Sequence, residues 1–217
     1  MTKASQSLYP DWVERYVAKR QKAERGTIIL FTGNINAMVS MAALSTAAYL
    51  DPTFTIEHAA ISLDRIEGFK FEELNLRQSL VINVVAIANP QTYWTAFYKM
   101  LDRLLQTIRK KQLTVILYGG RSSHVPVSIR NLVDIHFHNE DAKELTLGFY
   151  GEMLESGMNT FKTVVFPPPS TEIIEAYQEK FSEFLDETWR ERKAKLDAWE
   201  KGRRGRPRKT PDEKGEK

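Results

Sequence analysis

Residues 26–50 constrain the fold of this chain more than any other stretch. They open with an apolar run at residues 27–31, whose length and β-rich composition are typical of a buried strand. A turn follows at residues 32–36, and residues 37–50 are then dominated by small side chains, which suits a helix packed closely on a sheet. The stretch therefore predicts a strand, a tight turn and a buried helix, which is the layout of a phosphate-binding loop.

The same stretch fits the frame of the phosphate-loop pattern G-x-x-x-x-G-K-[ST] but lacks its chemistry. Gly33 takes the first glycine position and Ser40 the closing hydroxyl, while Met38 replaces the second glycine and Val39 replaces the lysine. That glycine lets backbone N–H groups close around the phosphates, and the lysine bridges the β- and γ-phosphates. We therefore predict a degenerate phosphate loop, with an ordinary strand–turn–helix as the alternative; its residues are Gly33, Asn34, Asn36, Met38, Val39 and Ser40.

The rest of the chain alternates between strand and helix patterns. Unbroken apolar runs at residues 80–88 and 113–118 have the composition of central parallel strands, and an amphipathic helix is expected between them at residues 93–111. Shorter strands are expected at residues 53–60, 133–138, 145–149 and 163–166, with a helix at residues 125–132. This alternation predicts an α/β fold, in which helices cover both faces of a mostly parallel sheet.

Three further segments flank this predicted α/β core at residues 26–169. Residues 1–25 hold a basic amphipathic helix, whose charged side is either solvated or in contact with nucleic acid. Residues 170–200 form one long charged helix with an apolar seam. Residues 201–217 are a basic tail that we expect to be disordered.

A working phosphate-loop enzyme also needs an acid at the end of a neighbouring apolar strand, where it holds Mg²⁺ and orients water. The run at residues 80–88 leads into Asn89, and Asn83 is its only polar residue; the run at residues 113–118 leads into Gly119. No acid stands at either exit. We therefore expect no hydrolysis, no catalytic residue and no cofactor. The chain also has no cysteine, which excludes disulfides and thiolate metal sites.

Several short stretches resemble those of archaeal P-loop NTPases carried by plasmids, viruses and integrated elements, which are related to DNA-translocating ATPases. They are Thr32-Gly33, residues 43–45, residues 51–56, residues 105–109 and residues 113–116. The resemblance covers roughly residues 25–140, and it implies a RecA-like sheet with a loop after residue 118 that faces a nucleotide. Active relatives are expected to carry a Gly-Lys pair and an acidic pair. Met38 and Val39 replace the first pair and residues 83–89 offer nothing for the second, so the resemblance implies a non-catalytic relative.

The basic tail resembles an AT-hook, a short DNA-binding motif. Its core is Arg204-Gly205-Arg206-Pro207, and it is flanked by Arg203, Arg208 and Lys209. The glycine lets the backbone run deep in a narrow groove and the proline keeps it extended, so that the two core arginines lie along the minor-groove floor of A·T tracts. The flanking cations would meet phosphates. The alternative is a solubilising or localisation tail.

Two weaker patterns complete the candidate sites. Arg121 and Arg130 are candidate phosphate contacts, because guanidinium groups fit phosphate oxygens, although a surface arginine is the commoner outcome. His124, His136 and His138 allow a zinc site to be imagined. Packed or surface histidines are the more frequent reading, so we predict no metal.

Taken together, these patterns favour a non-catalytic P-loop-fold protein that binds A·T-rich double-stranded DNA through its tail. The alternative is an NTP-binding or NTPase subunit of a DNA packaging or transfer machine, completed by a partner. A homo-oligomer or a partner ATPase is a further expectation. No apolar run reaches 18 residues and no leader is recognisable, so we expect a cytoplasmic, nucleoid-associated protein without membrane contact.

Overall fold

The computed structural model describes residues 11–33, 36–61, 73–84, 104, 107–108, 110–120, 125, 127–139, 148–153 and 162–204. The helices are α1 (Asp11–Lys22), α2 (Asn36–Leu50), α4 (Val127–Arg130) and α5 (Thr171–Arg204), with a 3₁₀ helix at Ile56–His58. The strands are β1 (Thr27–Gly33), β2 (Ala59–Ala60), β3 (Ser79–Asn83), β4 (Thr114–Gly119), β5 (Ile135–Asn139), β6 (Gly148–Met153) and β7 (Lys162–Val165). The chain divides into two compact units, Met1–Tyr177 and Gln178–Lys217.

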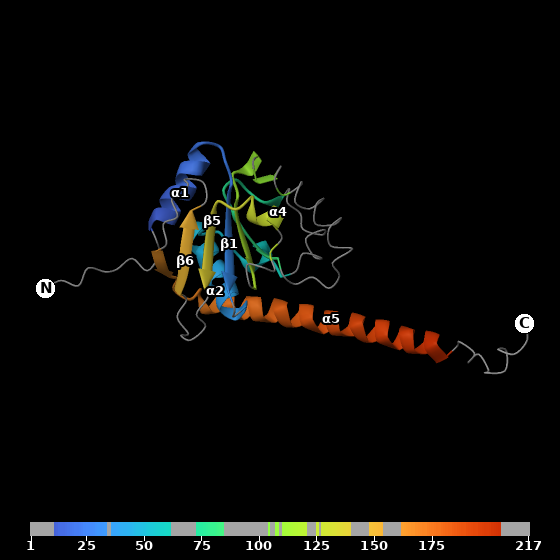
Figure 1. Ribbon diagram of the computed structural model, residues 1–217. Helices are drawn as coiled ribbons and strands as arrows, with labels where there is room; N and C mark the ends of the chain where they lie inside the picture. The colour runs from blue at the N-terminus through green and yellow to red at the C-terminus, as the bar shows by residue number, and fades with distance from the viewer. Residues whose placement is uncertain are drawn as a thin grey trace, which may run out of the picture. The chain divides into compact units, whose positions relative to one another are not determined.

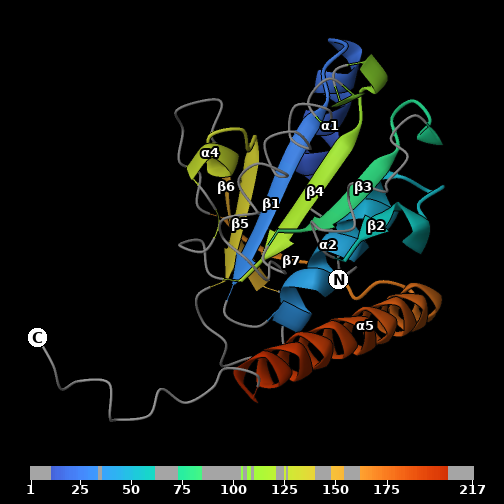
Figure 2. The same ribbon diagram turned by 90° about the vertical axis from the view of Figure 1, so that its right-hand side faces the viewer.

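The first unit is built on a seven-stranded sheet with the order β2-β3-β4-β1-β5-β6-β7. The first five strands in this order are parallel, whereas β6 pairs antiparallel with β5, and β7 pairs antiparallel with β6 at one edge. Strand β1 lies between β4 and β5, as Figures 1 and 2 show. All of its residues are buried. The α/β fold, with five parallel strands in the order 2-3-4-1-5 and a long C-terminal helix, confirms the predicted fold class.

Alternating residues of the strands supply a separate core on each face of the sheet. On one face, Ile28 and Leu30 belong to a buried cluster with Leu104 and Ile108, which lie in the segment predicted to be a helix. On the opposite face, α2 packs against β1, β3 and β4. Three stacked or edge-on phenylalanine rings with centroids 4.8–5.1 Å apart complete that second core: Phe31, Phe137 and Phe166. Helical residues therefore cover both faces, as the alternation of patterns predicted.

The predicted strand at residues 53–60 is wrong over most of its length, because within it only Ala59–Ala60 pair as a strand. The buried carboxylate of Asp51 explains the difference. Its Oδ1 accepts hydrogen bonds from the backbone N–H and the hydroxyl of Thr53, and its Oδ2 accepts one from the N–H of Ser79. Such a local side-chain turn bends the chain away from the sheet before it can pair.

Other predicted boundaries differ less. Helix α4 is shorter than the predicted helix at residues 125–132, and β6 extends to Met153, past the end of the strand predicted at residues 145–149. Helix α5 continues beyond the expected end at Glu200 to Arg204, so the disordered tail predicted from residue 201 is corrected for residues 201–204. Residues 85–90 and most of the predicted helix at residues 93–111 lie outside the described residues.

Within the part of the chain that the structure describes, no helix combines the length and the hydropathy that a membrane span requires.

Candidate functional site

The carboxyl edge of the parallel strands contains the predicted phosphate loop. There β1 ends at Gly33 and β4 ends at Gly119, and the N–H of Gly33 donates a hydrogen bond to the carbonyl of Gly120 at 3.1 Å. Helix α2 follows β1 onto one face, whereas Val125 and Val133, which flank α4, are buried in the cluster on the other face. The connections from two adjacent strands thus leave in opposite directions, and in open α/β sheets this is where ligands bind.

The predicted phosphate loop is too short to surround a phosphate. Strand β1 ends at Gly33 and α2 begins at Asn36, so that residues 34 and 35 alone join them, and Asn34 lies outside the described residues. The positions of the second glycine and the lysine therefore fall inside the helix. Met38 is 8% exposed, Val39 1% and Ser40 3%.

Val39 points back toward the end of β1. A Cβ atom added at Gly33 would lie 3.0 Å from Cγ2 of Val39 and 3.2 Å from the carbonyl oxygen of Asn139. The side chain at the lysine position therefore packs against the backbone of the strand, in the dry core. A valine suits this position because it is apolar and short, whereas a lysine there would have to bury its ammonium group.

A neutral hydrogen-bond chain lies at the end of β3, where a magnesium-binding acid would be needed. Asn83 is the last residue of β3, and it pairs in register with Tyr118 of β4. Its side chain hydrogen-bonds to the Tyr118 hydroxyl, which lies 2.9 Å from the hydroxyl of Tyr177 in α5. Burial and the neighbouring Tyr177 raise the pKa of Tyr118 well above its usual value, so this chain stays uncharged at neutral pH.

Thr32, His136 and His138 form a second polar cluster on the opposite face of the sheet. The Thr32 hydroxyl lies 2.8 Å from Nε2 of His136 and 2.6 Å from Nδ1 of His138. Burial lowers the pKa of His136 to about 4, assisted by His138 and by the positive charge of Arg130. His136 is therefore neutral at physiological pH. The sequence pattern singled out both histidines but not Thr32, which joins them only because β1 and β5 are neighbours.

The imagined zinc site gains no support from this arrangement. Among the described residues, no group of three or more histidine, cysteine or acidic side chains is placed to hold a metal ion. His124, the third histidine of the predicted set, lies outside those residues. The ring nitrogens that face Thr32 are engaged with its hydroxyl.

The two candidate phosphate-binding arginines are placed differently. Arg121 lies outside the described residues. Arg130 ends α4, and its Nε is buried without a hydrogen-bond partner among the described residues. Its charge acts on His136, so the two side chains lie within electrostatic range of each other. Arg130 thus remains a candidate contact for an anion.

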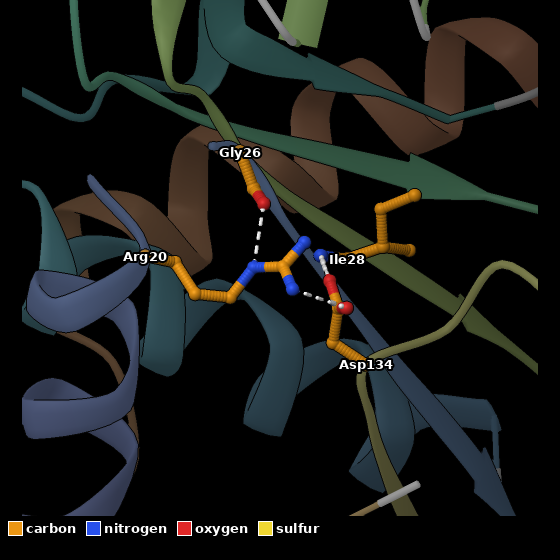
Figure 3. A network of polar contacts seen from close by, with 4 residues as sticks. All are labelled: Arg20, Gly26, Ile28 and Asp134. Atoms are coloured by element: carbon orange, nitrogen blue, oxygen red, sulfur yellow. Dashed lines mark hydrogen bonds and ion pairs between the residues drawn. The ribbon is translucent and has the colours of Figure 1, made fainter. Parts of the chain in front are cut away.

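One arginine of the basic N-terminal helix, Arg20, forms its polar contacts within the protein (Figure 3). Nε of Arg20 donates a hydrogen bond to the carbonyl of Gly26 at 2.9 Å, and its Nη1 lies 3.2 Å from Oδ1 of Asp134. The other oxygen of Asp134 accepts a hydrogen bond from the N–H of Ile28 at 2.8 Å. Arg20 therefore fastens α1 to the amino ends of β1 and β5, and it is not available to a nucleic acid.

Most of the predicted DNA-binding tail lies outside the described residues. Arg203 and Arg204 belong to the last turn of α5, whereas Gly205, Arg206, Pro207, Arg208 and Lys209 are not described. The AT-hook-like role of the tail stays a prediction.

Neither a protein-family model nor a curated protein sequence matches the chain. Several solved structures are similar in fold, among them the following three. A DNA polymerase III gamma subunit-related protein from Thermotoga maritima aligns with 62% of this chain and 46% of its own length, at 16% identity and a TM-score of 0.42. The cytoplasmic domain of the type VII secretion ATPase EccC from Thermomonospora curvata aligns with 65% of this chain and 24% of its own, at 13% identity and a TM-score of 0.40.

The third structure is the N-terminal domain of zonular occludens toxin from Neisseria meningitidis. It aligns with 70% of this chain and 98% of its own, at 12% identity and a TM-score of 0.44. The similarity to all three proteins is distant and concerns the fold alone. The resemblance to archaeal mobile-element P-loop NTPases stays a prediction.

Proposed function

We propose that this chain is a non-catalytic P-loop-fold protein that binds A·T-rich double-stranded DNA through its basic C-terminal tail. The observation that carries the proposed loss of catalysis is the burial of Val39, which occupies the lysine position and is 1% exposed. The phosphate-loop lysine reaches the β- and γ-phosphates with a long cationic side chain, whereas Val39 is short, apolar and packed in the core.

The neutral Asn83, which takes the place of a metal-binding acid at the described end of β3, supports the same conclusion. Asn83 is the last residue of β3, and its side chain hydrogen-bonds to the hydroxyl of Tyr118, which in turn hydrogen-bonds to the hydroxyl of Tyr177. All three groups are uncharged. A carboxylate that held Mg²⁺ would need an open, charged pocket there. The two changes lie in different elements, α2 and β3, and both remove groups that hydrolysis requires.

The proposal for DNA rests on the chemistry of residues 203–209, in which four arginines and one lysine surround a glycine and a proline. Minor-groove binding would need Arg204 to leave the last turn of α5 and become extended. Gly202 lies in that turn and favours the change, because glycine weakens a helix by about 1 kcal/mol relative to alanine. The extended arginines would then lie in the narrow, electronegative groove of A·T tracts.

The test compares DNA binding by the full chain and by paired variants, on A·T-rich and G·C-rich duplexes at several salt concentrations. Arg204→Ala with Arg206→Ala should remove the A·T preference, because these residues would reach the groove floor. Arg208→Ala with Lys209→Ala should weaken binding to both duplexes and reduce its salt dependence, because these residues would contact phosphates. Arg15→Ala with Arg190→Ala is the matched control, which removes two exposed arginines outside the tail.

Two outcomes would contradict this function. If the full chain binds neither duplex, the proposal fails. If the first variant keeps its A·T preference, the tail does not read the groove. Melting with and without Mg·ATP then tests the alternative of a nucleotide-binding subunit, because a ligand that binds the folded chain must raise its melting temperature. We expect no rise.

A further inference from the structure

The amino edge of the sheet, where the parallel strands begin, carries exposed positive charge. Figure 2 shows β3, β4 and β1 side by side, so the three segments that lead into these strands are neighbours. Four exposed side chains on these segments, which we call the amino-edge cations, are Lys22 and Arg25 before β1, Arg77 before β3 and Lys110 before β4. Among the residues that the structure describes, none of the four forms an ion pair.

The acids nearby do not cancel this charge. Glu24 is exposed in the turn before β1 and offsets one of the four cations. Glu73 and Lys111 have opposite charges, so together they add nothing. Glu57 stands before the outer strand β2, and Asp134, before β5, is already in an ion pair. The starts of β3, β4 and β1 therefore keep a net charge of +3, four cations less one acid.

Hydrogen bonds join the segment before β3 to the segment before β4. The N–H of Arg77 donates to the carbonyl of Lys111 at 2.8 Å, and Nε of Arg77 donates to Oε1 of Gln112 at 3.2 Å. The guanidinium of Arg77 is thus oriented beside the chain that carries Lys110. A guanidinium held in one orientation loses less conformational freedom when it binds a phosphate oxygen.

Close packing fixes the turn before β1 against the same segment. The N–H of Thr27 donates to the carbonyl of Leu113 at 2.9 Å. Gly26 leaves no room for a side chain, because an added Cβ would lie 2.8 Å from that carbonyl oxygen. The turn that carries Arg25 is therefore pressed onto the start of β4, and the cations of all three segments belong to one continuous surface.

The backbone of this surface is strained at three places. Glu24, Arg77 and Gln112 have positive φ angles of 57°, 66° and 54°. They are the non-glycine residues with positive φ that the structure describes, and one stands before each of the three adjacent strands. Side chains disfavour this conformation, and residues that adopt it are concentrated at functional sites. Their common location indicates that the shape of the amino edge matters to the function.

We propose that the amino edge binds the phosphate backbone of double-stranded DNA through the amino-edge cations. Neighbouring strands lie about 4.8 Å apart, so the starts of three strands span about 10 Å. Each DNA strand carries one phosphate per about 3.4 Å of helix axis, so this width faces about three phosphates. The net charge of the surface matches that number.

This surface deepens the proposed DNA-binding function and rests on it. The tail would select A·T tracts in the minor groove, whereas the amino-edge cations would contact phosphates, which are the same in every sequence. A single hook forms few contacts by itself. A second site on the same chain raises the affinity for a duplex that engages both sites.

The test measures binding of the full chain to A·T-rich and G·C-rich duplexes at several salt concentrations. One variant replaces all four amino-edge cations: Lys22→Gln, Arg25→Gln, Arg77→Gln and Lys110→Gln. We expect its binding to both duplexes to weaken by at least about tenfold, and its slope of log affinity against log salt concentration to become smaller by about three. The preference for A·T over G·C should not change, because the tail is intact.

The matched control lowers the net charge equally at four exposed positions of α5. Its substitutions are Arg190→Gln, Arg192→Gln, Lys193→Gln and Lys195→Gln. We expect it to keep the salt slope of the unmodified chain to within about one. Melting curves of both variants should match that of the unmodified chain, because all eight side chains are exposed.

The outcomes separate this surface from the tail. If the unmodified chain binds neither duplex, the proposed function fails, and this surface fails with it. If the unmodified chain binds but the amino-edge variant matches the control in affinity and salt slope, this surface is not a DNA contact, while the tail keeps its role. A loss confined to the A·T-rich duplex would also overturn the inference, because phosphate contacts act on both duplexes.

Cross-linking locates the DNA without removing a cation. The chain has no native cysteine, so a single cysteine can carry a photoreactive label. Ala23→Cys places the label in the exposed turn between Lys22 and Arg25, and Val127→Cys places it at the exposed first residue of α4. The label at position 23 should cross-link to bound DNA with a clearly higher yield than the label at position 127. Equal yields would contradict the proposed surface.

Discussion

The hydroxyl of Tyr118, the penultimate residue of β4, lies 2.9 Å from the hydroxyl of Tyr177 in α5. Both side chains are buried, and Asn83 bonds to the same Tyr118 hydroxyl. This contact joins the carboxyl edge of the sheet to the first turns of the C-terminal helix. It also places neutral, mutually satisfied groups beside the strand that would carry a metal-binding acid in a hydrolase.

Removal of the Tyr177 hydroxyl should cost stability without unfolding the protein. Tyr177→Phe keeps the ring in place but leaves Tyr118 with Asn83 as its remaining partner, so we expect the free energy of unfolding to fall by about 1 kcal/mol. Urea unfolding measures the change. Tyr49→Phe is the matched control, because the Tyr49 hydroxyl donates to exposed Glu14 and its loss should cost under about 0.5 kcal/mol. Equal losses of unfolding free energy in the two variants would show that the buried Tyr118–Tyr177 hydrogen bond stabilises the fold no more than the exposed one does.

Restoring the missing phosphate-loop residues should not restore nucleotide binding. Met38→Gly with Val39→Lys recreates the pattern, but both positions lie inside α2 and are buried. We expect a loss of stability of about 3 kcal/mol or more, because the variant buries a charge and empties an apolar site. Mg·ATP should not raise the melting temperature of this variant. Tyr49→Lys, at an exposed position of the same helix, is the control; a clear rise with Mg·ATP in the double variant would contradict the prediction.

Protonation of His136 should destabilise the fold. Its pKa is lowered from 6.5 to about 4 by burial, His138 and Arg130, so the unfolded chain takes up this proton at a higher pH than the folded chain does. Between about pH 6.5 and 4 the unfolded state therefore binds more protons, and stability falls as the pH falls, by up to about 3 kcal/mol. Urea unfolding of His136→Gln should show a flatter dependence over this window.

An NMR titration provides the independent check on His136. Its ring signals should titrate near pH 4, and Arg130→Met should move that titration upward, because a nearby positive charge disfavours protonation. A His136 ring that titrates near 6.5 in the wild-type chain would refute the assignment of its environment.

The ion pair between Arg20 and Asp134 should stabilise the amino edge of the sheet. Asp134→Ala removes the partner of Arg20 and the acceptor for the N–H of Ile28, so we expect a loss of about 2–4 kcal/mol. Asp134→Asn keeps an acceptor and should cost less. In a double-mutant cycle with Arg20→Ala the coupling energy should be about 1–3 kcal/mol.

The control for this cycle is Arg15→Ala on the same helix. Arg15 is exposed, and its Nε donates to the carbonyl of Asp11 within α1. Its loss should change stability by less than about 0.5 kcal/mol. Additive effects of Arg20→Ala and Asp134→Ala would show that the two side chains act independently.

Local patterns in the sequence were sufficient to predict the central strands and α2. The apolar runs that became β1, β3 and β4 are rich in β-branched residues, and the small residues of α2 match a helix pressed onto a sheet. The parallel arrangement also followed, because a crossover helix between two buried strands leaves few alternatives. The replacement of lysine by Val39 could be read directly from the spacing.

The sequence alone thus determined the class of fold, the order of its main elements and the residues missing from the phosphate-loop pattern, because these depend on neighbours within a few positions. Only the tertiary structure decided that the hydrogen bonds of Asp51 limit β2 to a short strand, that Thr32 hydrogen-bonds to two histidines, and that Tyr177 hydrogen-bonds to Tyr118. Each of these contacts links residues that lie far apart in the chain or depends on a side chain that competes with strand pairing. Such contacts arise from packing between elements, for which local periodicity carries no signal.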